Sequence, residues 1–319
     1  MPVLSFLFLL VGGLCLYYGA EWLVRGSAGL ALAFGISSVV VGLTVVSFGT
    51  SAPELVVSTL AAMTNKPAIA LGNVIGSNIA NIGLILGLTA LIAPPIAEGS
   101  LVARELPVLL IATAAVPLVL IDGTIGRIDA AIFVIGGIAF TYATLRWTDR
   151  EPKSLAEPDS ANHKPETLGK WALTGLVVAG LVVLFIGGKA FVEGAVGVAT
   201  WLGVSDRFVG LTVVALGTSL PELAASLVAA MRGHSELAVG NVIGSNILNI
   251  LLILGIAGLV HPIPGTLSES ALDLTLMGLL TLGCAVAVRC ERRITRLEGT
   301  VLLAGYFAFI GLLSQQSLG

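Results

Sequence analysis

Long apolar segments separated by short polar ones run through the whole chain. A helix of about 20 residues crosses the hydrocarbon core of a bilayer, and ten segments are apolar over such a length. The alternation of apolar and polar positions that marks a membrane β-barrel is absent. The pattern therefore predicts an all-α membrane protein with ten transmembrane helices, over residues 3–33, 38–63, 68–93, 102–121, 126–146, 168–201, 206–231, 237–260, 270–288 and 296–314.

One polar stretch interrupts this pattern in the middle of the chain. "TDREPKSLAEPDSANHKPE" holds three prolines and many charges, a composition typical of a flexible linker. It separates two sets of five spans, so we expect five-helix units at 1–147 and 168–319, joined by a linker at 148–167. The first span of each unit is long and rich in glycine, which predicts a tilted or bent helix.

The two units resemble each other in sequence. A shift of 168 residues places 42–87 on 210–255 without a gap, and 30 of these 46 positions are identical. Such agreement indicates an internal duplication. Because five is an odd number, the second copy enters the membrane from the opposite side. Inverted-topology repeats are typical of secondary transporters, whose site lies near the membrane midplane where the repeats meet.

Composition and charge agree with a membrane location. The chain is 56% hydrophobic and 11% charged, with a mean hydropathy of +1.01, whereas soluble domains carry about 25% charged residues. If the N-terminus lies outside, twelve of the sixteen Lys and Arg residues fall in inside segments. The positive-inside rule then places both termini outside and the 148–167 loop in the cytoplasm. We expect a multi-pass protein of the cell membrane, without a cleavable signal peptide. Its basic residues flank spans, so nucleic-acid binding has no support.

The most informative stretches are "GTSAPEL" at 49–55 and "GTSLPEL" at 217–223. A carboxylate at mid-membrane costs about 2.5–3.5 kcal/mol on insertion scales, and a proline inside a helix removes a backbone hydrogen bond. Pro53 would free the carbonyl of Gly49, and Pro221 would act in the same way in the second copy. A carbonyl freed inside a bilayer needs a new partner, and a bound cation is a suitable one.

Side chains around each proline offer further oxygen ligands. A spacing of four puts the threonine and the glutamate of each motif on one helix face, with a serine beside them. Hydroxyls, carbonyls and carboxylates form the all-oxygen set that Ca²⁺ and Na⁺ prefer. The glutamates are the acidic residues deepest in apolar sequence, so we expect them at the centre of the site. The set comprises Thr50, Ser51 and Glu54 in the first copy and Thr218, Ser219 and Glu222 in the second.

The third span of each unit adds a second polar row at a spacing of four, which follows one helix stripe. Glycine pairs in the same segments, Gly72 with Gly76 and Gly240 with Gly244, allow helices to approach closely. We expect them to bring the second and third spans of each unit together around an ion. The rows comprise Asn73, Ser77 and Asn81 in the first unit and Asn241, Ser245 and Asn249 in the second.

A plainer interpretation exists for each of these residues. Ser, Thr and Asn often serve as simple hydrogen-bonding links between membrane helices, and Asn78 and Asn246, three residues before the end of each row, belong to the same group. Two inverted copies, each with a proline, a glutamate and the later polar row, favour the ion site.

The first span of each unit carries one more repeated feature. Glu21 and Arg25 are four residues apart, and the aligned Lys189 and Glu193 repeat the spacing with the signs exchanged. A self-neutralising pair that lets each helix insert is the simpler interpretation, and a gating or interface contact is the alternative.

The repeats resemble the α-repeats of the sodium/calcium exchanger family, within the cation/calcium antiporter superfamily. The resemblance rests on the two "GTS-x-PEL" and "GNVIGSNI" motifs, covers essentially the whole chain and is to the compact prokaryotic type. It implies that Glu54 and Glu222 bind Ca²⁺ and take part in Na⁺ sites. It further implies as ligands the hydroxyls of Thr50, Ser51, Thr218, Ser219, Ser77 and Ser245, and backbone carbonyls near Ser47 and Ala215.

The resemblance also implies that Ca²⁺ and Na⁺ are transported ions, and neither an organic cofactor nor an obligate protein partner is expected. Asn249 is a departure, because several relatives, including potassium-dependent ones, carry aspartate there. Asn81 and Asn249 are both neutral here, so two glutamates would balance one Ca²⁺ or two Na⁺. A third Na⁺ would make exchange electrogenic, and K⁺ co-transport is disfavoured.

The sequence thus predicts a Na⁺/Ca²⁺ antiporter that works by alternating access, with the first and sixth spans sliding against the second, third, seventh and eighth. A proton-coupled Ca²⁺ exchanger stays open, because buried carboxylates can exchange protons as well as metal ions. A channel fits inverted copies less well. An enzyme is disfavoured, since P-loop, H-E-x-x-H and G-x-S-x-G motifs are absent. The histidines fall in loops or at helix ends: His163, His234 and His261. The cysteines are expected to be small buried side chains: Cys15, Cys284 and Cys290.

Overall fold

The structure is a computed structural model that describes residues 2–64, 66–97, 99–148, 168–203 and 215–318. Almost every regular element in it is helical. The first half contains α1 (Pro2–Phe34), α2 (Ser38–Val41), the π-helix η1 (Gly42–Val46), α3 (Ser47–Thr50), α4 (Ala52–Met63), α5 (Pro67–Ala80), the π-helix η2 (Asn81–Leu86), α6 (Gly87–Ile92), α7 (Gly99–Ala103), α8 (Glu105–Val119), β1 (Thr124–Ile125) and α9 (Arg127–Thr148).

The second half contains a similar series of long helices. It contains α10 (Lys170–Trp201), α12 (Ala215–Gly217), α13 (Leu220–Met231), α14 (Ser235–Leu248), the π-helix η4 (Asn249–Leu254), α15 (Gly255–Val260), β2 (Ile263–Pro264), α16 (Ala271–Glu291) and α17 (Arg296–Leu318).

The helices agree with the predicted spans. Among the described residues, eight helices are long and apolar enough to cross a membrane, and the bent pair Ser38–Thr50 and Ala52–Met63 makes a ninth. The predicted seventh span, 206–231, starts outside the described residues, and α12 and α13 form its described part. The prediction of an all-α membrane protein is confirmed.

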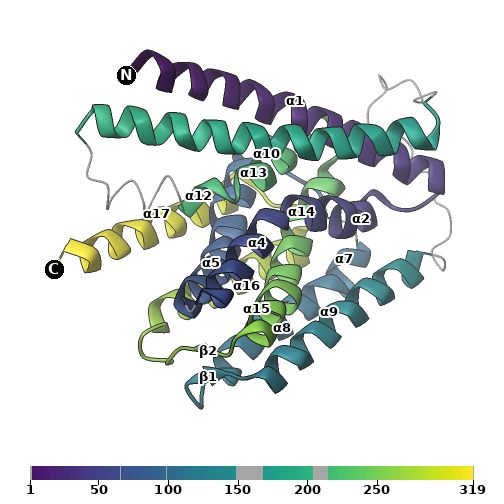
Figure 1. Cartoon of the computed structure of the whole chain (residues 1–319). Helices are drawn as coiled ribbons and strands as arrows, with labels where there is room; N and C mark the ends of the chain where they lie inside the picture. Colours follow the sequence, from purple (N-terminus) through teal and green to yellow (C-terminus); the bar gives the residue numbers. More distant parts are fainter. Residues whose placement is uncertain (1, 65, 98, 149–167, 204–214, 319) are drawn as a thin grey trace.

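The first and sixth spans form a long antiparallel pair along one side of the molecule, α1 with α10 (Figure 1). A Cβ atom built on Gly12 would lie 2.5 Å from the backbone nitrogen of Phe191, and one built on Gly180 would lie 2.6 Å from that of Leu23. The shift of 168 residues turns each of these contacts into the other. The interface therefore has a two-fold pseudosymmetry, as the prediction of inverted repeats requires.

Both helices of this pair are longer than a bilayer is thick. α1 has 33 residues and α10 has 32, which at 1.5 Å per residue is about 50 Å, against a hydrocarbon core of about 30 Å. Each is one continuous helix, so of the two predicted forms, tilted or bent, the tilted one stays the prediction. The glycines let the two backbones touch over most of this length, and the pair forms one unit.

Short strand contacts repeat the two-fold pattern away from this pair. Ile125 pairs with Ile263 in the β1–β2 ladder, next to Thr124 with Pro264. An isolated bridge joins Ile96 to Arg293, and the shift of 168 places these residues on Pro264 and Ile125, one residue of each strand of the β1–β2 ladder. Loops of the two halves are thus fastened to each other at two equivalent places.

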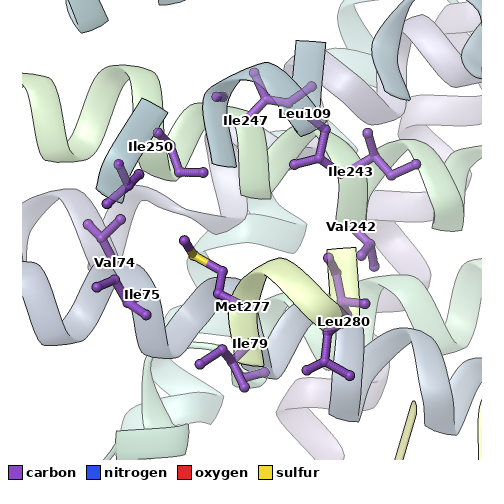
Figure 2. Packing of buried hydrophobic residues seen from close by; sticks show 14 of the residues in the cluster. Val74, Ile75, Ile79, Leu109, Val242, Ile243, Ile247, Ile250, Met277 and Leu280 are labelled. Carbon is purple, nitrogen blue, oxygen red and sulfur yellow. The ribbon is translucent and has the colours of Figure 1, made fainter. Parts of the chain in front are cut away.

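The third and eighth spans form the centre of the bundle. Within the most apolar window of each span, 72% of residues are buried in Ala68–Ile92 and 83% in Ser235–Val260, compared with 22% in the first span. Figure 2 shows how Ile79, Ile243, Ile247 and Met277 pack in this core. The outer helices instead present large apolar side chains outward, where lipid would surround them.

The glycines of the eighth span serve a different contact from the one predicted. A Cβ on Gly240 would lie 2.8 Å from the carbonyl oxygen of Val39, and one on Gly244 would lie 2.8 Å from Cα of Leu43. Both neighbours belong to the second span, in the other repeat. Gly72 and Gly76 have no described atom within 4 Å of such a Cβ. For Gly240 and Gly244 the expectation of a contact between the second and third spans of one unit was wrong, because the eighth span uses them to approach the opposite repeat; for Gly72 and Gly76 it stays a prediction.

Candidate ion-binding site

The two proline motifs lie where one helix ends and another begins. α3 ends at Thr50, α4 starts at Ala52, and the two are bent by 47°. Pro53 therefore occupies the first turn of α4, where no intrahelical bond to its nitrogen is required. Pro221 has the same position in α13. Each proline thus follows a break between two helices, and the break itself exposes polar backbone within the span.

This break also explains how two carboxylates are accommodated in the core. Glu54 lies in the first turn of α4 and Glu222 in the first turn of α13. Each residue is only 1% exposed. The amino end of a helix carries partial positive charge from its free N–H groups, so each carboxylate lies where the backbone favours an anion.

Each glutamate accepts a hydrogen bond from the other repeat. The hydroxyl of Ser51 donates to Oε1 of Glu222 at 3.0 Å, and that of Ser219 donates to Oε1 of Glu54 at 3.3 Å. Ser51 also lies 3.1 Å from Oγ of Ser245. The shift of 168 interchanges the two serine–glutamate bonds. The candidate site is therefore built jointly by the two repeats.

The first asparagine of each polar row supports the helix that carries the glutamate of the same repeat. Nδ2 of Asn73 donates to Oγ of Ser58 at 2.9 Å and to the backbone carbonyl of Glu54 at 3.4 Å. In the second repeat, Nδ2 of Asn241 donates to Oγ of Ser226 at 2.9 Å. Both asparagines thus hold the glutamate-bearing helix rather than a glutamate side chain.

Asn241 also joins the two repeats. Its Oδ1 accepts from the Thr50 hydroxyl at 3.3 Å, and its backbone carbonyl accepts from the Ser47 hydroxyl at 2.9 Å. The carbonyl of Ser47, which the family resemblance marks as a ligand, accepts the helical bond from the nitrogen of Ser51 at 3.0 Å. Ala215 lies at the start of α12, beside the segment outside the described residues.

Several buried polar atoms in this region have no hydrogen-bond partner in the described structure. They are Oε2 of Glu54, Oε2 of Glu222, Oγ1 of Thr218, Oδ1 of Asn81 and both amide atoms of Asn249. Unpaired buried polar atoms are costly, and all but one of these atoms are oxygens. No group of three or more His, Cys, Asp or Glu occurs among the described residues. The donor set therefore fits a hard cation better than a transition metal.

Four residues that the sequence analysis did not assign to the site belong to its surroundings. Ser58 and Ser226 are fully buried partners of the row asparagines, and Asn78 and Asn246 lie in the last turn of α5 and of α14, just before the π-helices. The sequence repeat could have identified them, because the shift of 168 places Ser58 on Ser226 and Asn78 on Asn246. Ser77 and Ser245, which were assigned, are 5% and 0% exposed.

The charged residues of the first and sixth spans behave differently from each other. Lys189 and Glu193 form the predicted pair within one helix, at 3.9 Å and largely exposed. Glu21 accepts a hydrogen bond from Nε of Arg232 at 2.8 Å, at the end of α13. The hydrogen bond and the charge of Glu21 raise the pKa of Arg232. This contact is the interface alternative, because it joins the long helix pair to the glutamate-bearing helix.

The cysteines only partly follow the expectation of small buried side chains. Cys284 is buried, Cys15 is half-buried and Cys290 is exposed at the end of α16. For Cys290 the prediction was wrong, because its position one residue before the helix end places it beyond the packed core.

Comparisons with known proteins agree with this architecture. The sequence profile of the family described as sodium/calcium exchanger protein matches residues 4–146 and 172–315. The chain is 38% identical over 310 residues to a protein with the name "Putative antiporter CaxA" from Alkalimonas amylolytica, covering 96% of each chain. It is 33% identical to the sodium/calcium exchanger MaX1 from Methanosarcina acetivorans, covering 98% of this chain and 99% of that one.

Solved structures give the same result in three dimensions. The sodium-calcium exchanger NCX_Mj, soaked with zero Na⁺ and Ca²⁺, matches with a TM-score of 0.85 at 34% identity. The match covers 98% of this chain and 100% of that chain. The family profile, the full-length relatives and the shared fold lead to one conclusion: the chain belongs to the sodium/calcium exchanger family of membrane antiporters.

Proposed function

We propose that the protein exchanges Na⁺ for Ca²⁺ across the cell membrane at a site centred on Glu54 and Glu222. The observation that carries the proposal is the reciprocal contact of Ser51 with Glu222 and of Ser219 with Glu54. It brings two buried carboxylates to the boundary between the repeats, each with its second oxygen unpaired. A divalent cation would satisfy both oxygens at once.

Charge balance supports competition between the two ions. The neutral side chains of Asn81 and Asn249 leave two full negative charges at the proposed site. One Ca²⁺ or two Na⁺ would neutralise these charges, and a third Na⁺ would make a cycle electrogenic. A buried pair of anions without a cation is strongly unfavourable. The protein should therefore change access only when ions are bound, which couples the two fluxes.

The helix packing supports a division into a mobile and a fixed part. α1 and α10 touch through backbone atoms at several glycines and carry none of the proposed ligands. The central helices α5 and α14 are the most deeply buried. In our proposal the long pair slides as one unit against this centre, which exposes the site to each side of the membrane in turn.

The deciding experiment is uptake of ⁴⁵Ca²⁺ into proteoliposomes that contain the purified protein. Vesicles are loaded with Na⁺, with no gradient, or with a pH gradient alone. Glu54→Gln and Glu222→Gln are measured beside the wild type, and Glu298→Gln, on α17 away from the site, serves as a matched control. We expect uptake that requires internal Na⁺, is lost in both site variants and persists in the control.

Other outcomes would redirect the proposal. Uptake driven by the pH gradient and indifferent to Na⁺ would make the protein a proton-coupled Ca²⁺ exchanger. Uptake that persists in both site variants would place the ion elsewhere. Uptake that stops without K⁺ would overturn the expectation, drawn from Asn249, that K⁺ is not co-transported.

A further inference from the structure

Four buried asparagines form a chain between the two repeats next to the proposed ion site. Asn78 and Asn81 come from the end of α5 and the start of η2, and Asn246 and Asn249 come from the end of α14 and the start of η4. None of the four is more than 1% exposed. The shift of 168 pairs Asn78 with Asn246 and Asn81 with Asn249.

One half of this cluster is hydrogen-bonded across the repeats. Nδ2 of Asn81 donates to Oδ1 of Asn246 at 2.9 Å, and Nδ2 of Asn246 donates to the backbone carbonyl of Asn78 at 3.3 Å. The amide of Asn81 is held by its nitrogen, so its oxygen points away from Asn246. That oxygen is buried and has no described partner.

The other half lacks the equivalent bond. Symmetry would require Nδ2 of Asn249 to donate to Oδ1 of Asn78. Both of these atoms are buried and unpaired. Asn78 has instead turned its amide nitrogen to the carbonyl of Val74 in its own helix, at 2.7 Å. Identical residues at equivalent positions thus have two arrangements: in one half the bond between the repeats is formed, and in the other half it is absent.

We infer that Asn246 and Asn78 are positioning residues. Asn246 orients the side-chain amide of Asn81 in one access state, and Asn78 orients that of Asn249 in the other. In the state described here, Asn246 fixes the side chain of Asn81 so that Oδ1 of Asn81 is free for a cation. No equivalent bond among the described residues orients the side chain of Asn249. In the opposite state the repeats exchange arrangements, and Asn78 fixes Asn249. The inference rests on the proposed ion site at Glu54 and Glu222.

This role explains why a neutral asparagine can serve at these positions. An amide oxygen is a weak ligand unless its direction is set, and the outer partners of metal ligands typically change affinity about 10- to 100-fold when removed. A side-chain amide supplies an NH₂ donor group and a carbonyl acceptor at once. The same group can therefore hold a neighbour in one state and bond its own helix in the other.

The first test is a double-mutant cycle on Ca²⁺ binding by the purified protein, measured with ⁴⁵Ca²⁺. We expect Asn246→Ala to weaken binding by about 10-fold or more, and Asn81→Ala to weaken it by a similar factor. The double variant should be no weaker than Asn81→Ala alone, because Asn246 acts through Asn81. Independent, multiplying effects would overturn the inference.

The second test uses the symmetry of the cluster. In proteoliposomes of fixed orientation, Asn246→Ala should raise the half-saturating Ca²⁺ concentration at one membrane face, and Asn78→Ala should raise it at the other. Equal effects of both variants at both faces would indicate a structural role only and would refute the inference. Thermal unfolding of each variant shows whether it folds. If the alanine variant of Asn246 does not fold, Asn246→Ser repeats the test, because its hydroxyl is too short to reach Asn81.

The two proposals fail in distinguishable ways. If the wild type binds no Ca²⁺ and shows no Na⁺-driven uptake, the proposed function fails. If the wild type binds and exchanges but the cycle is additive and the faces respond alike, only the positioning role fails.

Discussion

Replacing Gly180 by alanine should destabilise the protein by forcing α1 away from α10. The new Cβ would lie 2.6 Å from the nitrogen of Leu23, 2.8 Å from the carbonyl oxygen of Gly19 and 3.0 Å from Cα of Leu23. All three are backbone atoms, so no change of rotamer relieves the clash. Ordinary contacts begin near 3.4 Å, so the helices must separate locally by roughly 1 Å. Such overpacking costs about 1–3 kcal/mol.

Gly175→Ala is the matched control, since it makes the same change in the same helix. No described atom lies within 4 Å of a Cβ at Gly175, and alanine is favoured over glycine in a helix by about 0.5–1 kcal/mol. Both variants gain this propensity term, so it cancels, and they should differ in free energy of unfolding by the overpacking cost of about 1–3 kcal/mol.

The assay is thermal unfolding of the detergent-purified protein, followed as loss of the monodisperse peak in size-exclusion chromatography. At about 2–4 °C per kcal/mol, Gly180→Ala should unfold several degrees below Gly175→Ala. Gly12→Ala, its symmetry equivalent, should show a similar loss. If Gly180→Ala and Gly175→Ala unfold at the same temperature, the close approach of the two backbones does not stabilise the fold, and the treatment of α1 and α10 as one unit fails.

Three further predictions concern the site, the helix pair and the orientation. Ser51→Ala and Ser219→Ala each remove a hydrogen bond to a buried carboxylate, which is worth about 1.5–3 kcal/mol. Each variant should therefore raise the half-saturating Ca²⁺ concentration of uptake at least tenfold. Thr300→Ala removes an exposed hydroxyl on α17, and a similar shift in this control would contradict the reasoning. Glu21→Gln should change the ratio of Ca²⁺ affinities at the two membrane faces by a few-fold, and an unchanged ratio would show that the contact with Arg232 does not depend on the access state. Cys290 should react with a membrane-impermeant maleimide in inside-out vesicles and not in intact cells, with Cys290→Ser as the control; labelling from outside would reverse the predicted topology.

The spans and their symmetry could be predicted from the sequence because both are carried by patterns that run along the chain. Apolar length marks a span wherever it occurs, and the shift of 168 residues relates the halves without any structure. The two glutamates stood out for a related reason: a charge in an apolar helix is costly, so its presence demands an explanation. These features depend on local sequence alone.

Features that depend on the partner across the interface could not be predicted in the same way. The helix break after Thr50 places Pro53 in a first turn, but a proline at that spacing fits a kink equally well. The π-helices η2 and η4 begin at Asn81 and Asn249, and nothing in their apolar sequence differs from an α-helix. The choice of partner for Gly240 depended on which repeat faced it. Such details follow from packing between segments that are far apart in the chain, and the local sequence does not reveal them.

The departures from symmetry bear most directly on how the protein works. Alternating access in inverted repeats interchanges the arrangements of the two halves, so a contact that lacks a symmetry equivalent favours one access state if the other state breaks it. The Glu21–Arg232 pair is such a contact, because the shift of 168 places Lys189 and Thr64 at these positions, and threonine cannot form an ion pair. The side chains of Glu21 and Arg232 are 26% and 44% exposed, and pairs of this kind contribute about 0.2–1 kcal/mol. That amount shifts an equilibrium between two states by a few-fold at most. The pair can therefore bias the cycle towards the state described here without trapping it, and in our proposal ion binding at Glu54 and Glu222 keeps control of the exchange.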